Sequence, residues 1–124
     1  MPSPHRGAGQ ASVETALVLP FVAALLLTLV QVGLVARDQI LVIHAAREGA
    51  RAAAVDPHPR TAHRAAAEGA PLRSDRIRVE TTTSGDGSRV RVGVSYRSPT
   101  DVPLVGGLVG DIPLTAAVTM RIER

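Results

Sequence analysis

The most constraining feature of this 124-residue sequence is a 22-residue stretch without a formal charge, TALVLPFVAALLLTLVQVGLVA, at residues 15–36. A helix rises about 1.5 Å per residue, so this stretch spans roughly 33 Å, enough to cross the hydrocarbon core of a bilayer. The 88 residues that follow are too few to enclose such a helix on all sides. We therefore expect a helix that spans a membrane and contacts membrane lipid, and not the buried helix of a soluble protein.

A cleaved secretory signal peptide is the main alternative explanation of this stretch. The apolar part of a signal peptide is about 7–15 residues long, which is shorter than residues 15–36. The sequence that follows, LVAR at residues 34–37, lacks a good A-x-A cleavage pattern. We therefore expect a retained anchor whose transmembrane part is residues 15–36.

The helical pattern continues beyond the anchor. Apolar residues such as Ile40 and Ile43 recur at helical spacing, while the charged residues lie mainly elsewhere. The sequence DPHP at residues 56–59 ends the helix, because the residue before a proline is disfavoured in the α region. We expect an unstructured, Pro- and Gly-rich leader over residues 1–9, followed by one helix over residues 10–55 whose second half is amphipathic.

Alternation of apolar and polar residues predicts three strands in the remaining segment. Residues 77–81 and 90–96 alternate with a period of two and flank the turn sequence SGDGS. Residues 115–122 alternate in the same way. We also expect a short Ala-rich helix over residues 61–69, and an ion pair between Glu80 and Arg89 or Arg91 on the polar face of the first two strands.

The apolar face of such a sheet needs a cover. Ala45, Gly49 and Ala53 recur every four residues in the second half of the long helix, and small side chains there let another backbone approach closely. We expect this stripe to pack within the chain or between subunits. The fold class is therefore α+β: a long N-terminal transmembrane helix extends into an amphipathic helix and packs on a small three-stranded antiparallel sheet. This sheet belongs to a small α+β domain of residues 56–124.

Another apolar segment, the loop at residues 102–110, contains the sequence LVGGLV. It could fold over the core, contact lipid or meet a partner, and the sequence does not decide between these alternatives.

Composition argues against several classes of function. Cysteine is absent, which excludes disulfides, thiolate zinc sites and cysteine nucleophiles. Only Phe21 and Tyr96 are aromatic, so a base-stacking surface for single-stranded nucleic acid is not expected. The 14 basic residues are dispersed among 11 acidic ones and form no concentrated basic segment of the kind that binds DNA. We expect no nucleic-acid partner.

The sequence offers no candidate catalytic or metal site. His58 and His63 lie near Asp56 around a Pro-rich break, without a repeated metal-ligand spacing, and are typical of a solvated loop. The serines lack the context of a nucleophile elbow. We therefore expect a non-enzymatic protein with no metal, no cofactor and no small-molecule substrate.

Glu14 at the edge of the apolar stretch is the one charged residue that demands a partner. A carboxylate drawn into lipid costs roughly 2.5–3.5 kcal/mol on insertion scales, unless it is paired or reaches water. Gly9 lies five residues upstream, within the sequence GQASVE. A cut after Gly9 would expose the amine of Gln10 and make Glu14 the fifth residue of the mature chain. The amine of one subunit could then pair with Glu14 of the next.

Two sequence blocks resemble the TadE-like family, the pilus assembly proteins or pseudopilins of the Flp/Tad type IV pilus system. They are RGAGQASVETALVLP at residues 6–20 and HAAREGARAAAV at residues 44–55. The resemblance implies Gly9 as the residue before the prepilin peptidase cut, Gln10 as the mature N-terminus and Glu14 as the acid that contacts neighbouring subunits. In the second block the residues that match the family motif are Ala45, Ala46, Arg47, Glu48 and Arg51.

The sequence departs from the family pattern at two positions. Thr15 stands where the family usually has an aromatic residue, and Gln31 stands where many members carry an acid late in the span. The first departure concerns recognition by the peptidase, and the second concerns charge pairing within the membrane.

The resemblance implies a membrane-anchored pilus assembly component whose partners are lipid, prepilin peptidase, other pilins or pseudopilins and the assembly machinery. It implies a single-pass protein of the cytoplasmic (inner) membrane, with its N-terminus in the cytoplasm and its C-terminal domain outside, and leaves open a place in the pilus itself. The positive charges that follow the span favour the opposite orientation by number alone. The alternative function is a single-pass membrane protein whose outer domain binds a partner unrelated to pili.

Overall fold

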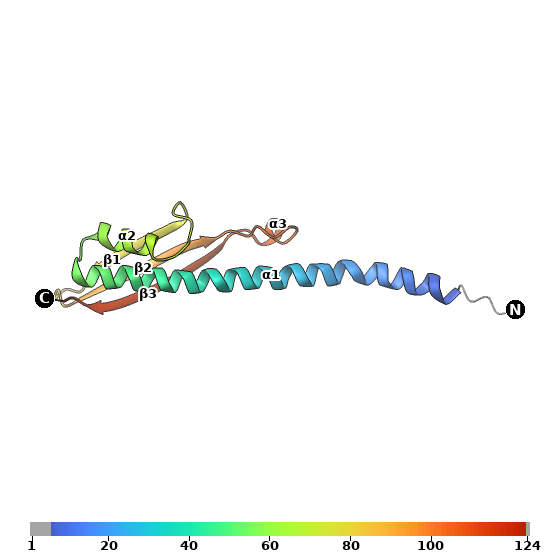
Figure 1. Cartoon of the computed structure of the whole chain (residues 1–124), viewed down its shortest axis with the longest axis horizontal. Helices are drawn as coiled ribbons and strands as arrows, with labels where there is room; N and C mark the ends of the chain where they lie inside the picture. Colours follow the sequence, from blue (N-terminus) through green and yellow to red (C-terminus); the bar gives the residue numbers. More distant parts are fainter. Residues whose placement is uncertain (1–5, 124) are drawn as a thin grey trace.

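The computed structural model describes residues 6–123 of the chain. A long helix forms a rod, and a small domain packs on its C-terminal part, while the N-terminal half of the rod projects away from the domain (Figure 1). The elements in chain order are α1 (Arg6–Val55), α2 (Pro59–Glu68), β1 (Ile77–Thr83), β2 (Arg89–Ser98), α3 (Gly106–Val109) and β3 (Ile112–Arg121).

The sheet is three-stranded and antiparallel, in the order β1-β2-β3, so the predicted α+β class is confirmed. Its inner face is apolar because strand side chains alternate between the two faces. On β2, Val90, Val92 and Val94 are at most 1 % exposed. The C-terminal part of α1 packs on β2 and β3, and α2 packs on α1 and β1. The hydrophobic core therefore lies between the sheet and the two helices.

The stripe of small residues on α1 packs within the chain, as one of the two predicted alternatives. Ala45 and Ala53 have no exposed surface. A Cβ placed on Gly49 would lie 3.0 Å from Val92 Cγ1 and 3.2 Å from the carbonyl oxygen of Ala62. Glycine at this position therefore lets α1 approach both β2 and α2.

The inner face of α1 differs from the face predicted from its apolar residues. Ile40 is 56 % exposed, whereas Val42 is fully buried. Val42 lies three residues before Ala45 and so shares its face of the helix. The small residues, and not the largest ones, therefore determine which side of α1 faces the sheet.

The helix also begins earlier than predicted. Residues 6–9 are helical, whereas we expected them to belong to an unstructured leader; residues 1–5 of that leader lie outside the described part of the chain. Each glycine costs a helix about 1 kcal/mol, but extending an existing helix adds one hydrogen bond per residue. Propagation from the long helix therefore reaches beyond Gly9. The predicted C-terminal end at residue 55 agrees with Val55.

The prediction that Glu80 pairs with Arg89 or Arg91 is wrong. In the observed register Glu80 lies opposite Gly93, so Arg91 is only a diagonal neighbour. Diagonal pairs are about 7–8 Å apart. Within residues 6–123 no ion pair joins Glu80 to Arg89 or Arg91. The register was not predictable from alternation alone.

Asp86 organises the turn between β1 and β2. Its carboxylate accepts hydrogen bonds from the hydroxyl of Ser84 at 2.5 Å and from the hydroxyl and backbone N–H of Ser88 at 2.7 and 3.1 Å. These donors, the Ser84 hydroxyl first, hold the pKa of Asp86 well below its ordinary value of 3.8. Gly87 takes the positive φ of 69° that the turn requires.

We expect Asp86→Ala to lower the urea concentration at which the domain unfolds. The folded-state pKa of Asp86 is depressed, so its contribution is present above about pH 4 and is lost as the pH falls through the folded-state pKa. The difference in midpoint between wild type and Asp86→Ala should therefore be constant near neutral pH and shrink in acid. A difference that is independent of pH down to pH 2 would contradict this role of the carboxylate.

Candidate functional site

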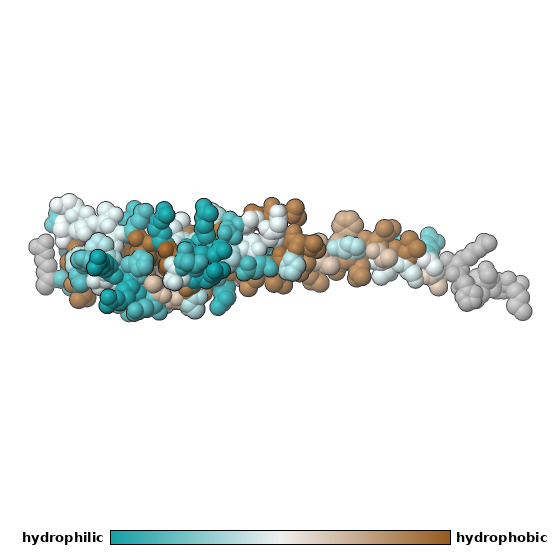
Figure 2. Space-filling view, turned by 90° about the horizontal axis from the view of Figure 1, so that it is seen from above, coloured by the Kyte–Doolittle hydropathy of each residue, from teal (hydrophilic) through white to brown (hydrophobic). Residues whose placement is uncertain are grey.

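The N-terminal half of α1 is the most unusual surface of the molecule. The structure has one helix that is long and apolar enough to cross a membrane, and only 6 % of its most apolar 18-residue window is buried. Figure 2 shows the brown apolar side chains gathered along this part of the rod. A core helix would be mostly buried, so this surface needs lipid or other helices as its surroundings. The same helix runs without a break into the domain.

Glu14 lies on this exposed rod. Its neighbours on one face of the helix are Thr15, Val18, Leu19 and Val22, and it forms no ion pair with any residue from 6 to 123. The hydroxyl of Thr15 donates to the carbonyl oxygen of Ala11 at 2.9 Å and is therefore occupied within its own helix. Within the described chain, the Glu14 carboxylate is thus available to a group from outside.

Gly9 and Gln10 are exposed near the start of the same helix. A Cβ placed on Gly9 would meet nothing within 4 Å, and the same holds for Gly7. Packing therefore does not explain a glycine at position 9. The bond after Gly9 lies within the first turns of α1, where a helix frays most easily, so a peptidase would have to unwind only the end of the rod.

The second family block lies in the domain, far from Glu14. Ala45 and Ala46 are fully buried in the core, whereas Arg47 and Arg51 are exposed. Glu48 forms an i,i+3 ion pair with Arg51, with 3.8 Å between carboxylate and guanidinium. At about 1.5 Å per residue, Glu14 and Glu48 are roughly 50 Å apart along α1. The two blocks therefore cannot form one site within a single chain.

His58 and Asp56, near the break between α1 and α2, organise the start of α2, whereas His63 is exposed on that helix. His58 Nδ1 accepts a hydrogen bond from the backbone N–H of Arg60 at 3.2 Å, and α2 starts at Pro59, two residues before the predicted start. The Thr61 hydroxyl, 2.7 Å from Asp56, and the backbone N–H of His58 lower the pKa of that carboxyl. Within residues 6–123 no group of three or more potential ligands could hold a metal ion.

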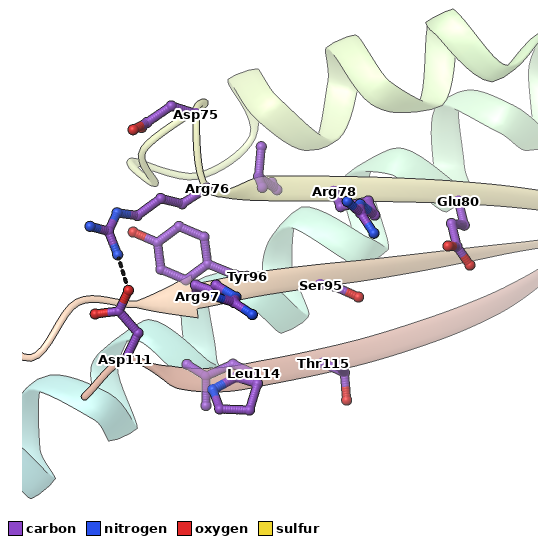
Figure 3. Close-up of a pocket in the computed structure, with 12 residues that line it drawn as sticks. Asp75, Arg76, Arg78, Glu80, Ser95, Tyr96, Arg97, Asp111, Leu114 and Thr115 are labelled. Atoms are coloured by element: carbon purple, nitrogen blue, oxygen red, sulfur yellow. Dashed lines mark hydrogen bonds and ion pairs between the residues drawn. The ribbon is translucent and has the colours of Figure 1, made fainter. Parts of the chain in front are cut away.

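A hollow of about 570 Å³ lies at the end of the sheet where β1 begins (Figure 3). Arg76 and Asp111 form an ion pair across it at 2.9 Å. Sequence analysis missed this pair because the two residues are 35 positions apart and become neighbours only when β3 returns to the sheet. The side chains in Figure 3 show a structural ion pair, and none of their hydrogen bonds joins a nucleophile to a base.

The outer face of the sheet is polar and basic. It carries one acid, Glu80, and five arginines that take part in no ion pair within the described chain. This face is therefore suited to water, in contrast to the N-terminal half of α1. The five residues are Arg78, Arg89, Arg91, Arg97 and Arg121.

One known protein family matches a part of the long helix α1. Residues 9–51 match the family model described as TadE-like protein. The matched segment contains Gly9, Glu14, the whole uncharged stretch and the second block as far as Arg51. No curated protein and no solved structure matches the chain. Residues 9–51 are therefore similar to TadE-like proteins, in agreement with the resemblance seen in the two sequence blocks.

Proposed function

We propose that this chain is a pseudopilin-like assembly component of a Flp/Tad-type pilus, held in the cytoplasmic membrane by α1 and without enzymatic activity. One observation carries the proposal: a single helix presents, in order, Gly9, Glu14, an exposed uncharged span and a motif that packs on the domain through Ala45 and Ala46. The family match over residues 9–51 covers all four features.

The proposed mechanism begins with cleavage after Gly9 by prepilin peptidase. Cleavage exposes the amine of Gln10, about one helical turn before Glu14. Glu14 is exposed and unpaired within the described chain, so the new amine of one subunit can pair with Glu14 of a neighbouring pilin. This pairing offsets the cost of a carboxylate at the membrane edge and favours helix–helix association.

The orientation follows from the same mechanism. Prepilin peptidase acts on the cytoplasmic side in this family, so the N-terminus is in the cytoplasm and the domain lies outside. The basic outer face of the sheet is then in the extracytoplasmic water layer.

Glu14→Ala is expected to weaken association with the pilins or pseudopilins of the same cell. The substitution leaves the neighbour's amine without a counter-charge in an apolar environment, so we expect at least a tenfold loss of copurified partner, equivalent to about 1.4 kcal/mol. Copurification from detergent-solubilised membranes, together with a count of surface pili, measures the effect.

Thr15→Ala is the matched control, because Thr15 is the adjacent exposed residue and its hydroxyl is bonded only to its own helix. The control should copurify partners and support pili as the wild type does. Equal association of the Glu14→Ala and Thr15→Ala variants, with unchanged piliation, would overturn the proposal and favour a single-pass protein unrelated to pili.

A further inference from the structure

The loop between β2 and β3 carries an exposed apolar tip. Leu104, Leu108 and Val109 are 77, 89 and 55 % exposed. Apart from residues of α1, these are the only exposed large apolar side chains in the described chain. The tip has no charged residue between Asp101 and Asp111. Here we call residues 102–110, which include α3, the apolar tip.

The apolar tip lies beside the end of the uncharged stretch of α1. The Ser98 hydroxyl at the end of β2 donates to Asp38 at 2.6 Å, which places this end of the sheet next to residue 38. Beyond Ser98 the chain continues along α1 toward its N-terminus, and α3 lies beside the cyan part of the rod (Figure 1). The tip therefore reaches past Asp38 and alongside residues that we assign to the membrane.

The burial of Gln31 agrees with this placement. Gln31 is 4 % exposed, although its neighbours Val30 and Val32 are 55 and 60 % exposed. One side of α1 is therefore covered at this level. The amide nitrogen and oxygen of Gln31 have no hydrogen-bond partner in the described chain. The segment that covers Gln31 therefore offers it no polar group, as expected of an apolar segment.

Several backbone groups of the tip are hydrogen-bonded within the tip and its base. The N–H groups of Gly106, Val109 and Gly110 donate to carbonyl oxygens four residues earlier, at 2.9, 3.1 and 3.2 Å, and the Thr100 hydroxyl donates to the Gly110 carbonyl. Internal hydrogen bonds are what lipid requires of a backbone that enters it. Leu104 has a positive φ of 69°, which is strained for a leucine, and its side chain is exposed.

We propose that the apolar tip inserts into the leaflet on the domain's side and forms a second lipid contact beside α1. Gln31 lies seven residues before Asp38, so the tip reaches roughly 10 Å below the level of Asp38. Interfacial helices bury their apolar faces about 5–10 Å deep, in agreement with this depth. The rod and the tip together fix the height and the rotation of the domain on the bilayer. This lipid contact goes beyond the proposed pilus function, and it rests on that function in one respect, the insertion of α1 in the membrane.

Tryptophan fluorescence tests the proposal on the full chain, which contains no native tryptophan. Three single variants are reconstituted in vesicles of phosphatidylcholine and phosphatidylglycerol, with and without lipids brominated near the headgroup end of the acyl chains. Leu108→Trp reports on the tip and Phe21→Trp on the rod. Thr82→Trp, at an exposed position of the sheet, is the reference for a tryptophan in contact with water. The first two side chains are 89 and 77 % exposed, so neither substitution disturbs the core.

We expect Leu108→Trp to emit at shorter wavelength than Thr82→Trp and to be quenched by the shallow bromines. If Leu108→Trp emits at the same wavelength as Thr82→Trp while the emission of Phe21→Trp is still blue-shifted, the proposal is overturned and the membrane anchor stands. A blue shift without bromine quenching would also overturn it, because the tip would then be covered by another protein copy. Loss of the blue shift for Phe21→Trp would overturn the anchor, and with it the proposed function.

Discussion

Gly49→Leu is expected to lower the free energy of unfolding of the domain by about 3 kcal/mol relative to Gly33→Leu. A Cβ at position 49 would lie 3.0 Å from Val92 Cγ1, 3.2 Å from the Ala62 carbonyl oxygen and 3.3 Å from Ala66 Cβ. The Ala62 carbonyl belongs to the backbone of α2 and cannot rotate away as a side chain can. Helix α1 must therefore move away from both β2 and α2. A leucine side chain extends this conflict far beyond one methyl group.

Gly33→Leu is the matched control, because Gly33 lies in the same helix and a Cβ there would meet nothing within 4 Å. Both variants gain about 1 kcal/mol of helix propensity, so their difference isolates the packing conflict. Tyr96 is the only tyrosine and is 4 % exposed, so its fluorescence during urea unfolding of the full chain in detergent follows the domain core. Equal unfolding midpoints would show that α1 does not pack on the sheet as described.

Gly9→Leu is expected to abolish removal of the leader. The proposed cut follows residue 9, and we expect a peptidase site that accepts glycine there to exclude a branched side chain. Packing within the chain cannot account for such an effect, because a Cβ at Gly9 or at Gly7 would meet no atom within 4 Å. Immunoblots of a C-terminally tagged chain, in cells with an active prepilin peptidase, distinguish the long precursor from the mature form.

Gly7→Leu is the control for helix stability. Either substitution strengthens the start of α1 by about 1 kcal/mol and makes its unwinding equally costly. We expect Gly7→Leu to be processed nearly as wild type and Gly9→Leu to accumulate as precursor. Normal maturation of Gly9→Leu would contradict cleavage at this position.

The predictable part of the fold is what local periodicity determines. An uncharged stretch from 15 to 36 can form only one kind of element, and the Asp56-Pro57 break ends it in the expected place. Alternation along β2 predicted which of its valines are buried. The small-residue stripe at Ala45, Gly49 and Ala53 predicted a close approach of two backbones.

The features that escaped prediction depend on distant segments. Strand register determines that Glu80 faces Gly93 and not an arginine, and alternation alone carries no information on register. The Arg76–Asp111 ion pair forms only when the loop before β3 returns to the sheet, and the burial of Gln31 has no signal in the local sequence. In the candidate site, Gly9 and Glu14 are predicted from their spacing to the apolar stretch. Their roles depend on molecules outside the chain.

We propose that a trimmed helix presents Glu14 near a new amine at the membrane surface. Mass spectrometry of the N-terminal peptide, from the membrane fraction of cells with an active prepilin peptidase, measures this directly. We expect a mature chain that begins with Gln10 and retains residues 15–36 in the membrane fraction. A membrane-bound chain that still carries residues 1–9 in such cells would contradict it.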